Sequence, residues 1–207
     1  MAIFKLTKEA LVPLMETQLH TEGIFERKDL QRLLRTQIQA LDPDLMVISE
    51  EFDQWVASSR RIDLLCIDRE ANLVIVELKR SEDGGYMELQ AIRYAAMIST
   101  MTFSQLADAH KQYLSKLGQN AEDAEENILS FLKWDQPDDD RFASAVRIIL
   151  AAADFSKELT TSILWLNEQG LDIRCVRLKP YRDADGAVLI DVQQLIPLPE
   201  ATDYQTQ

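Results

Sequence analysis

The sequence predicts an α/β (α+β) fold in which helices flank a central mixed β-sheet. Three observations support this prediction. Strand-like and helix-like segments alternate along the 207 residues, a pattern typical of sheets covered by helices. The run SAVRIILAAAD is apolar almost throughout, as expected of a strand buried on both faces. No repeat or low-complexity linker divides the chain. We therefore expect a single domain over residues 1–207, with a helical acidic insertion at about 102–141.

The composition is that of a folded protein in a reducing compartment. Hydrophobic residues make up 46% of the chain and charged residues 28%, unlike a disordered protein. No cleavable leader or membrane-spanning run is recognisable, so we expect a cytoplasmic protein. Cys66 and Cys175 each lie in an apolar run and are expected to be buried, reduced thiols. Two histidines and no CxxC motif argue against structural zinc.

The charge distribution argues against one class of nucleic-acid-binding protein. A formal net charge of −13 is unsuited to a protein that coats nucleic acid non-specifically. Residues 60–93 nevertheless contain six basic and seven acidic residues, so nearly all the negative excess lies elsewhere. It is concentrated in residues 121–127 and 135–140. A local nucleic-acid site within residues 60–93 is compatible with this distribution.

The first quarter of the chain predicts helices followed by a strand. Residues 11–25 contain helical stretches that end at Gly23, and residues 26–41 form a second helix that ends at an Asp-Pro-Asp turn. The stretch LMVISEEF, residues 45–52, predicts a strand. The second helix carries a one-sided apolar stripe. Its members are Leu30, Leu33, Leu34, Ile38 and Leu41.

The next segment predicts a β-hairpin followed by a helix. The hairpin comprises a strand at residues 62–68, a turn at 69–71 and a strand at 72–79. The stretch YMELQAIRYAAMIST, residues 86–100, follows as a helix.

The rest of the chain predicts helices and then a second β-rich portion. Residues 103–134 are helical and more polar, and residues 144–154 form the apolar central strand. Ser156 caps a helix that Gly170 ends. Two final strands, residues 171–182 and 187–199, are joined through an Asp-Gly turn.

Charged residues interrupt the hairpin where a buried strand should carry Val or Ile. Asp63 breaks the first strand, and Glu77 and Lys79 break the second. Because strand side chains alternate between faces, a turn centred on Glu70 places Asp63 opposite Glu77. Like charges at such positions repel, so either the strand ends splay into solvent or a cation lies between them. A slip of one residue would separate the pair.

The cation hypothesis supplies a chemistry. Two carboxylates with the carbonyl of Leu78 suit Mg²⁺ or Mn²⁺, hard ions that prefer oxygen ligands. Such an ion lowers the pKa of bound water and polarises a phosphoryl oxygen. Lys79, on the face of Glu77, could orient the attacking water or stabilise developing negative charge. The alternative is an ordinary solvated Glu-Lys pair at a strand end.

The spacing of these residues resembles a known nuclease pattern. Asp63 followed by Glu77-Leu78-Lys79 resembles the D…(D/E)xK core of the PD-(D/E)XK nuclease superfamily, and Gln90 and Tyr94 match the QxxxY motif of its RecB-like branch. The flanks RRIDLL, VIVELKR and LQAIRYAA are most similar to NucS-like endonucleases. The resemblance covers about residues 26–100, with Ile62 where the superfamily motif has proline. It implies a restriction-endonuclease-like core and a Mg²⁺-dependent or Mn²⁺-dependent endonuclease that hydrolyses DNA.

The helix after the hairpin carries two further candidates. Gln90 and Tyr94, four residues apart, share one helix face. An amide and a phenol there could hydrogen-bond Lys79, a metal-bound water or a phosphate oxygen, as the QxxxY resemblance implies. The alternative is an ordinary amphipathic helix in which Tyr94 is half-buried.

A further carboxylate is expected from upstream. Family members add a Glu from an upstream helix, and Glu26 is the best match. It could equally be a first-turn glutamate that favours the helix dipole. Asp29 competes with it, and Glu50 or Glu51 is a second source. We expect Glu51 to form a structural ion pair with a neighbouring arginine of the Arg60-Arg61 pair.

Four arginines surround the expected centre and would contact phosphates. They are Arg60, Arg61, Arg80 and Arg93. A different class of function stays open: a nuclease fold that serves as a weakly active or inactive module for binding nucleic acid or protein. The sequence leaves open whether the protein is a monomer or a homodimer. It also leaves open DNA against RNA and endonuclease against exonuclease action.

Overall fold

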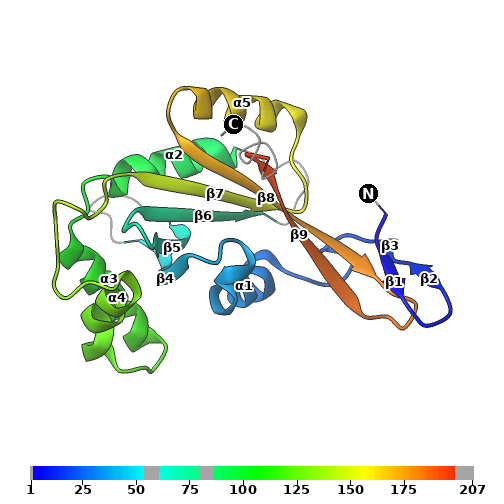
Figure 1. The fold of residues 1–207 in the computed structure, drawn as a ribbon, viewed down its shortest axis with the longest axis horizontal. Coiled ribbons are helices and arrows are strands. Elements are labelled where there is room, and N and C mark those ends of the chain that lie inside the picture. Colours follow the sequence, from blue (N-terminus) through cyan, green and yellow to red (C-terminus); the bar gives the residue numbers. More distant parts are fainter. Residues whose placement is uncertain (1, 54–60, 80–85, 199–207) are drawn as a thin grey trace.

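Seven strands form one mixed sheet in the computed structural model, which describes residues 2–53, 61–79 and 86–198 (Figure 1). The strand order is β3-β8-β7-β6-β5-β4, and β9 pairs with β8. Strands β6, β7 and β8 are parallel, and the other neighbours are antiparallel. The predicted α+β class with a mixed sheet is confirmed. The strands are β3 (Met15–Glu16), β4 (Leu45–Phe52), β5 (Ile62–Asp68), β6 (Leu73–Lys79), β7 (Val146–Ala152), β8 (Asp172–Arg182) and β9 (Val188–Ile196).

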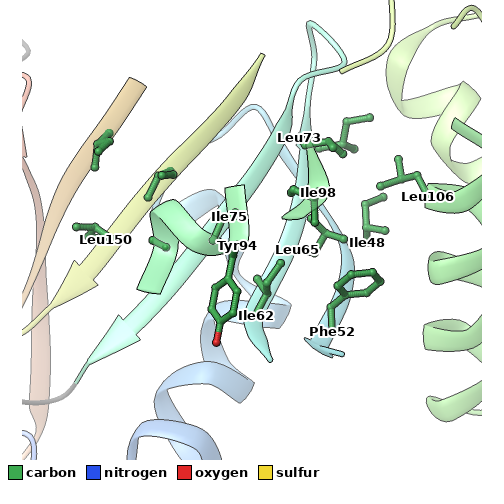
Figure 2. Close-up of a cluster of buried hydrophobic side chains, with 14 of the residues drawn as sticks. Ile48, Phe52, Ile62, Leu65, Leu73, Ile75, Tyr94, Ile98, Leu106 and Leu150 are labelled. Atoms are coloured by element: carbon green, nitrogen blue, oxygen red, sulfur yellow. The ribbon is translucent and has the colours of Figure 1, made fainter. Parts of the chain in front are cut away.

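Helices cover both faces of this sheet. One face packs against α2, α3 and α5, and Figure 2 shows part of the resulting core. The other face packs against η1 and α1, which contribute Leu30 and Leu34. The helical elements are η1, a π-helix (Glu26–Gln31), α1 (Arg32–Thr36), η2 (Ile38–Ala40), α2 (Met87–Ile98), α3 (Phe103–Lys116), η3 (Ala121–Asp123), α4 (Ala124–Leu132) and α5 (Lys157–Glu168).

The central hairpin is apolar because both of its faces are buried. Leu73 and Ile75 of β6 pack in the cluster beneath α2, whereas Val74 and Val76 pack in the cluster against η1 and α1. All seven residues of β5 are buried. The predicted hairpin and its alternation are confirmed. Asp63 and Glu77 are therefore ionisable side chains at buried positions between apolar residues of β5 and β6.

Several other elements agree with the sequence predictions. The apolar run forms β7 in the middle of the sheet. Ser156 caps α5 by accepting a hydrogen bond of 3.1 Å from the backbone N–H of Leu159. Strands β8 and β9 are joined through Asp185 and Gly186, and Gly186 has a positive φ of 86°. Both cysteines are free and buried.

The helices predicted in residues 11–25 are wrong. This segment instead contains strands β2 (Leu11–Pro13) and β3, and β2 pairs with β1 (Phe4–Leu6). Strand β3 pairs with the far end of β8, where Met15 faces Arg182. Partners distant in the chain thus override the local helical pattern.

The helix predicted over residues 26–41 is broken into three parts. A π-helix, a short α-helix and a 3₁₀ turn follow one another. Leu30, Leu34 and Ile38 are buried as predicted, but Leu33 is 44% exposed. Because the π-helix has a wider turn than the α-helix, it shifts the apolar stripe relative to the 3.6-residue period.

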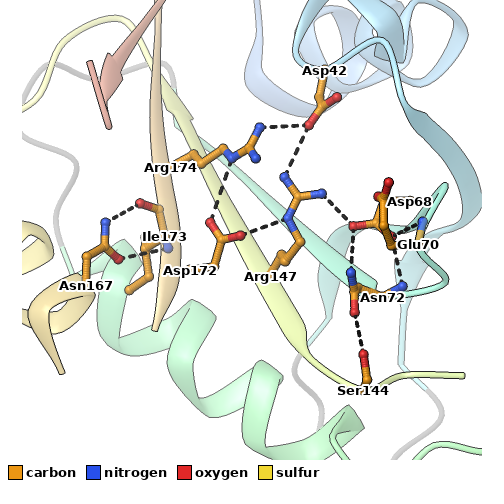
Figure 3. Close-up of polar contacts among 10 residues, drawn as sticks. All are labelled: Asp42, Asp68, Glu70, Asn72, Ser144, Arg147, Asn167, Asp172, Ile173 and Arg174. Carbon is orange, nitrogen blue, oxygen red and sulfur yellow. Dashed lines mark hydrogen bonds and ion pairs between the residues drawn. The ribbon is translucent and has the colours of Figure 1, made fainter. Parts of the chain in front are cut away.

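A buried ion cluster fixes the turn of the hairpin (Figure 3). Arg147 of β7 lies 2.6 Å from Asp68, 3.3 Å from Asp42 and 3.0 Å from Asp172. Asp68 is fully buried, and its carboxylate also accepts the backbone N–H groups of Glu70 and Asn72. One carboxylate thus closes the turn and ties it to the neighbouring strand.

The acidic region at 102–141 contains α3, η3 and α4. Its helix α3 packs against β4, where His110 Nδ1 lies 2.9 Å from the carbonyl oxygen of Ile48. That the region is an insertion into a single domain stays a prediction. Among the described residues, no helix has the length and apolar character needed to cross a membrane.

Replacing Arg147 with methionine should destabilise the fold strongly. The substitution leaves the fully buried carboxylate of Asp68 without its counter-charge, which costs about 3–5 kcal/mol. It also removes one of the two guanidinium groups that contact Asp42. Urea unfolding would measure the change in the free energy of unfolding. The matched control is Arg141→Met, because the Arg141 side chain is 65% exposed. Equal stability of the two variants would contradict the role given to the cluster.

Candidate active site

The hairpin register brings Asp63 and Glu77 together. Leu64 pairs with Val76 and Leu65 with Ile75, so the next pair in the same register is Asp63 and Glu77. The predicted register is confirmed, with no slip. On its other side Glu77 pairs with Leu150 of β7.

The two carboxylates lie in the protein interior. Asp63 is 6% exposed and Glu77 is fully buried. The backbone N–H of Leu78 donates a hydrogen bond of 2.8 Å to the Asp63 carboxylate. Burial raises the pKa of Asp63 to about 6, and burial together with the nearby Asp63 charge raises the pKa of Glu77 to about 8. The pair therefore retains a proton at neutral pH that exposed carboxylates would have lost.

Lys79 supplies the positive charge beside this pair. Its Nζ lies 3.0 Å from Glu77 Oε1 and 3.8 Å from Glu26 Oε1. It also donates to the carbonyl oxygen of Leu78 at 3.1 Å. Burial disfavours the ammonium form, but the facing carboxylates outweigh burial and raise the pKa of Lys79. Lys79 is therefore charged at neutral pH and balances one of these carboxylates.

One carboxylate oxygen has no hydrogen-bond partner. Glu77 Oε2 is buried and accepts no hydrogen bond from the described residues, a situation that typically costs about 1–3 kcal/mol. A dry oxygen acceptor beside a second carboxylate fits a hard divalent cation such as Mg²⁺ or Mn²⁺. Burial is the main cause of the raised pKa of both acids, and the repulsion of neighbouring carboxylates adds to it.

The set of acidic side chains is smaller than in a complete metal site. Across residues 2–53, 61–79 and 86–198, no three Asp, Glu, His or Cys side chains are grouped so that they could hold a metal ion. Asp63 and Glu77 would need additional oxygens from the backbone, water or substrate. The carbonyl of Leu78 accepts from Lys79, and Glu26 lies 3.8 Å from the same ammonium. Metal ligation by Leu78 and Glu26 stays a prediction.

Helix α2 places Gln90 and Tyr94 over the pair. Gln90 Nε2 donates to the Tyr94 hydroxyl at 3.0 Å, and a backbone hydrogen bond with Arg61 also reaches this hydroxyl. Tyr94 is 1% exposed and packs in the core (Figure 2). Burial raises the pKa of Tyr94, and the charge of Glu77 adds to this effect. Tyr94 thus combines packing in the core with a hydroxyl beside the carboxylates.

The π-helix η1 contributes two residues from the opposite face. Glu26 reaches Lys79, and Gln31 Nε2 donates to the backbone carbonyl of Asp63 at 3.3 Å. Gln31 is 4% exposed, and its Oε1 is buried without a described hydrogen-bond partner. The sequence pattern does not place Gln31 beside Glu26, because residues five apart share a face in a π-helix but not in an α-helix.

Glu51 is held beside Asp63 by two arginines. Arg27 Nε lies 3.4 Å from its Oε1, and Arg61 Nη1 lies 3.6 Å from its Oε2. The expected ion pair with a neighbouring arginine is confirmed for Arg61. Glu51 has a positive φ of 49°, a conformation that costs energy in a residue other than glycine and is enriched at functional sites. Arg27 was missed, since nothing in the local sequence links it to β4.

The other two carboxylates considered from sequence are engaged elsewhere. Asp29 accepts the backbone N–H of Phe25 at 2.9 Å, at the start of η1. Glu50 pairs with Arg35 at 2.8 Å. Glu26 and Glu51, by contrast, both act electrostatically on Asp63.

A cavity of about 890 Å³ opens beside the carboxylate pair. Its wall combines the candidate catalytic residues with basic side chains and with two exposed apolar residues of the α2 region, Tyr86 and Leu89. Arg60 and Arg80 lie outside the described residues. The lining residues that bear charge or belong to the QxxxY pair are Glu26, Arg27, Arg61, Asp63, Lys79, Gln90, Arg93 and Tyr94.

Comparisons with known proteins find similarity in structure only. No protein-family model matches the chain, and no curated protein matches it significantly. Two NucS-like nuclease structures are similar: EndoMS in complex with double-stranded DNA (16% identity, TM-score 0.42) and a repair endonuclease from Pyrococcus abyssi (17%, 0.40). Each alignment covers 72% of this chain. The chain spans less than half of those proteins, 43% and 45% of their respective lengths.

Replacing Glu77 with glutamine should stabilise the metal-free protein at high pH. Because folding raises the pKa of Glu77 from 4.5 to about 8, protons favour the folded state, and stability falls as the pH rises through this range. Above about pH 8, we expect the melting temperature of the variant to exceed that of the wild type by at least about 2–4 °C. This is the shift that a stability change of about 1 kcal/mol produces in a chain of this length. Thermal melts followed by circular dichroism would measure it.

The exposed Glu168 provides the control, since Glu168→Gln removes the same charge from the end of α5. We expect its melting temperature to follow that of the wild type at every pH. Coincident wild-type and Glu77→Gln melting temperatures above pH 8 would contradict the proposed burial of charge.

Proposed function

We propose that the protein is a metal-dependent nuclease that hydrolyses phosphodiester bonds of DNA. The observation that carries this proposal is the buried pair Asp63 and Glu77 beside a cavity lined by arginines. One oxygen of Glu77 has no hydrogen-bond partner in the part of the chain that the structure describes. A fold has no stability reason to bury two carboxylates opposite each other in a dry sheet. Such a costly arrangement is typical of functional sites.

Different residues of the chain would have different roles in this reaction. Asp63 and Glu77 would hold Mg²⁺ or Mn²⁺, which supplies Lewis acidity toward a phosphoryl oxygen and lowers the pKa of bound water. Lys79 places a permanent positive charge within 3.0 Å of Glu77, where it can stabilise negative charge on the phosphate. The Gln90–Tyr94 hydrogen bond fixes two polar groups at the cavity wall.

The basic residues of the wall suit a phosphodiester backbone. Arg27, Arg61 and Arg93 line the same cavity as Asp63 and Lys79. Arg93 is exposed, whereas Arg27 and Arg61 are bound to Glu51. Phosphates entering the cavity would compete with Glu51 for these guanidinium groups. The strong negative charge of the rest of the chain would confine DNA to this basic surface.

A second candidate function is a nuclease-fold module that binds nucleic acid or protein without cutting. The observation that favours it is the position of Lys79, whose ammonium already contacts Glu77 and the carbonyl of Leu78. In such a module the lysine takes the place of the cation. The two functions differ in one measurable property, the binding of a divalent metal ion.

With Mn²⁺, the purified protein should cleave at least one form of DNA among duplex, single-stranded, flapped and mismatched substrates. Glu77→Gln and Asp63→Asn should each lower the rate by at least about 10²-fold, equivalent to about 2.7 kcal/mol of transition-state stabilisation. Glu168→Gln, far along the chain at the end of α5, should retain full activity. Gel assays on labelled substrates would measure the rates.

Calorimetry separates the two functions. Metal binding to the protonated pair releases protons, so the heat of Mn²⁺ binding should depend on the buffer in the wild type and much less so in Glu77→Gln. Absence of Mn²⁺ binding, together with absence of cleavage, would reject the nuclease and leave the binding module.

Replacing Arg93 with glutamine should weaken DNA binding without changing the metal site. Loss of one phosphate contact lowers the slope of log affinity against log salt by about 0.9 for duplex DNA or about 0.7 for a single strand. Fluorescence anisotropy at several salt concentrations would measure the slope, and calorimetry should give unchanged Mn²⁺ affinity. Arg141→Gln is the matched control. An unaltered salt slope for Arg93→Gln would remove this residue from the DNA surface.

A further inference from the structure

An apolar arm extends from the sheet beyond its covering helices (Figure 1). It consists of β1, β2, β3, the outer half of β8 and β9, that is, residues 2–16 and 177–196. Salt bridges from Lys5 to Asp183 and Asp185 join its two parts. Among the described residues, eight of the seventeen exposed large hydrophobic side chains belong to it. They are Phe4, Leu6, Leu11, Met15, Val188, Leu189, Ile190 and Val192.

The arm is electrically neutral on a strongly acidic protein. It contains five basic and five acidic residues, so the whole net charge of −13 lies on the remainder of the chain. The net negative charge on the rest of the chain makes two copies repel each other over most of their other surface. The arm combines exposed apolar area with charge neutrality. Large exposed apolar patches mark interaction sites, and neutrality favours a second copy as the partner.

The backbone of β9 offers an open edge at this patch. The N–H of Asp183 donates to the carbonyl of Ala187, which identifies these two residues as a hydrogen-bonded pair. Antiparallel pairs alternate, so Val188, Ile190 and Val192 direct their N–H and C=O groups away from β8. The carbonyl of Pro180, opposite Ile190, agrees with this pattern, because it accepts from Thr17 on the other side of β8.

We propose that two copies of the chain join through antiparallel pairing of β9 with its counterpart, centred on Ile190. In this register Ile190 pairs with Ile190 of the partner subunit, and Val188 pairs with the partner's Val192. The outward backbone groups of three residues are thereby satisfied in each copy. Asp191 faces the partner's Leu189, so no like charges oppose each other. The interface is isologous, as in most homodimers.

The register also explains the composition of β9. Val188, Ile190 and Val192 share one face and are 37–38% exposed, and Leu189 on the other face is 45% exposed. Long, flat apolar edges are normally interrupted by lysine, proline or a bulge because they promote association. The exposed stretch of β9 carries none of these between Val188 and Val192. Its sequence is that of a strand that is covered in the assembled protein.

Sedimentation equilibrium of the full chain tests this proposal. We expect the wild type to have twice the chain mass of 23.7 kDa. Ile190→Pro should reduce the mass to that of one chain, because proline removes an outward N–H that the β8–β9 ladder does not use. A double variant, Val188→Lys with Val192→Lys, should do the same through charge repulsion. Leu164→Lys, at a 53% exposed position on α5, should remain a dimer.

Circular dichroism would establish that each variant is folded. A wild type that sediments as a single chain at micromolar concentration would overturn the proposal, and the arm would then serve a different partner. A dimer that survives in either folded β9 variant would overturn it equally. The proposal is independent of the nuclease activity, since β9 contributes no residue to the cavity.

Discussion

The register of the β5–β6 hairpin is the constraint on which the candidate site depends. Asp68 closes the turn with its own backbone and holds Arg147 of the next strand. At the opposite end of the hairpin, the same register places Asp63 against Glu77. A shift of one residue would direct one carboxylate to the other face of the sheet. The ion cluster at the turn and the carboxylate pair at the opposite end therefore depend on the same hairpin register.

The two ends differ in how their buried charge is balanced. Around Arg147, three carboxylates face two guanidinium groups at distances from 2.6 to 3.7 Å. At Glu77 one lysine contacts two carboxylates, Glu77 and Glu26, and one Glu77 oxygen has no hydrogen-bond partner among the described residues. Buried carboxylates that have guanidinium partners can help to maintain a unique structure. Where the nearby positive charge is smaller, the pKa of buried acids rises, and an additional cation would be needed to keep them ionised. The contrast within a single sheet supports a structural role for the Arg147 cluster and is the basis of the metal-dependent function proposed for the Glu77 cluster.

The sequence predicted the structure correctly where the strand period of two and the positions of charged residues indicated the same arrangement. The interrupted strands predicted the hairpin, its register and the proximity of Asp63, Glu77 and Lys79, because a period of two leaves few alternatives. Other parts depend on contacts that local patterns do not contain. Gln31 reaches Asp63 through a π-helix, and Glu51 meets Arg27 through a residue with positive φ. Residues 11–16 form strands because β1 and β8 supply partners from outside the segment.

A row of paired residues runs across the sheet from the carboxylates to the arm. Glu77 pairs with Leu150, Leu150 with Cys175, and Cys175 with Ile196 at the end of β9. Each step is a main-chain pairing between neighbouring strands, and the last lies beside a register shift at Cys175. In the proposed dimer, the strand that pairs with the second copy would therefore be three strands away from Glu77 and joined to it through paired residues of β7 and β8.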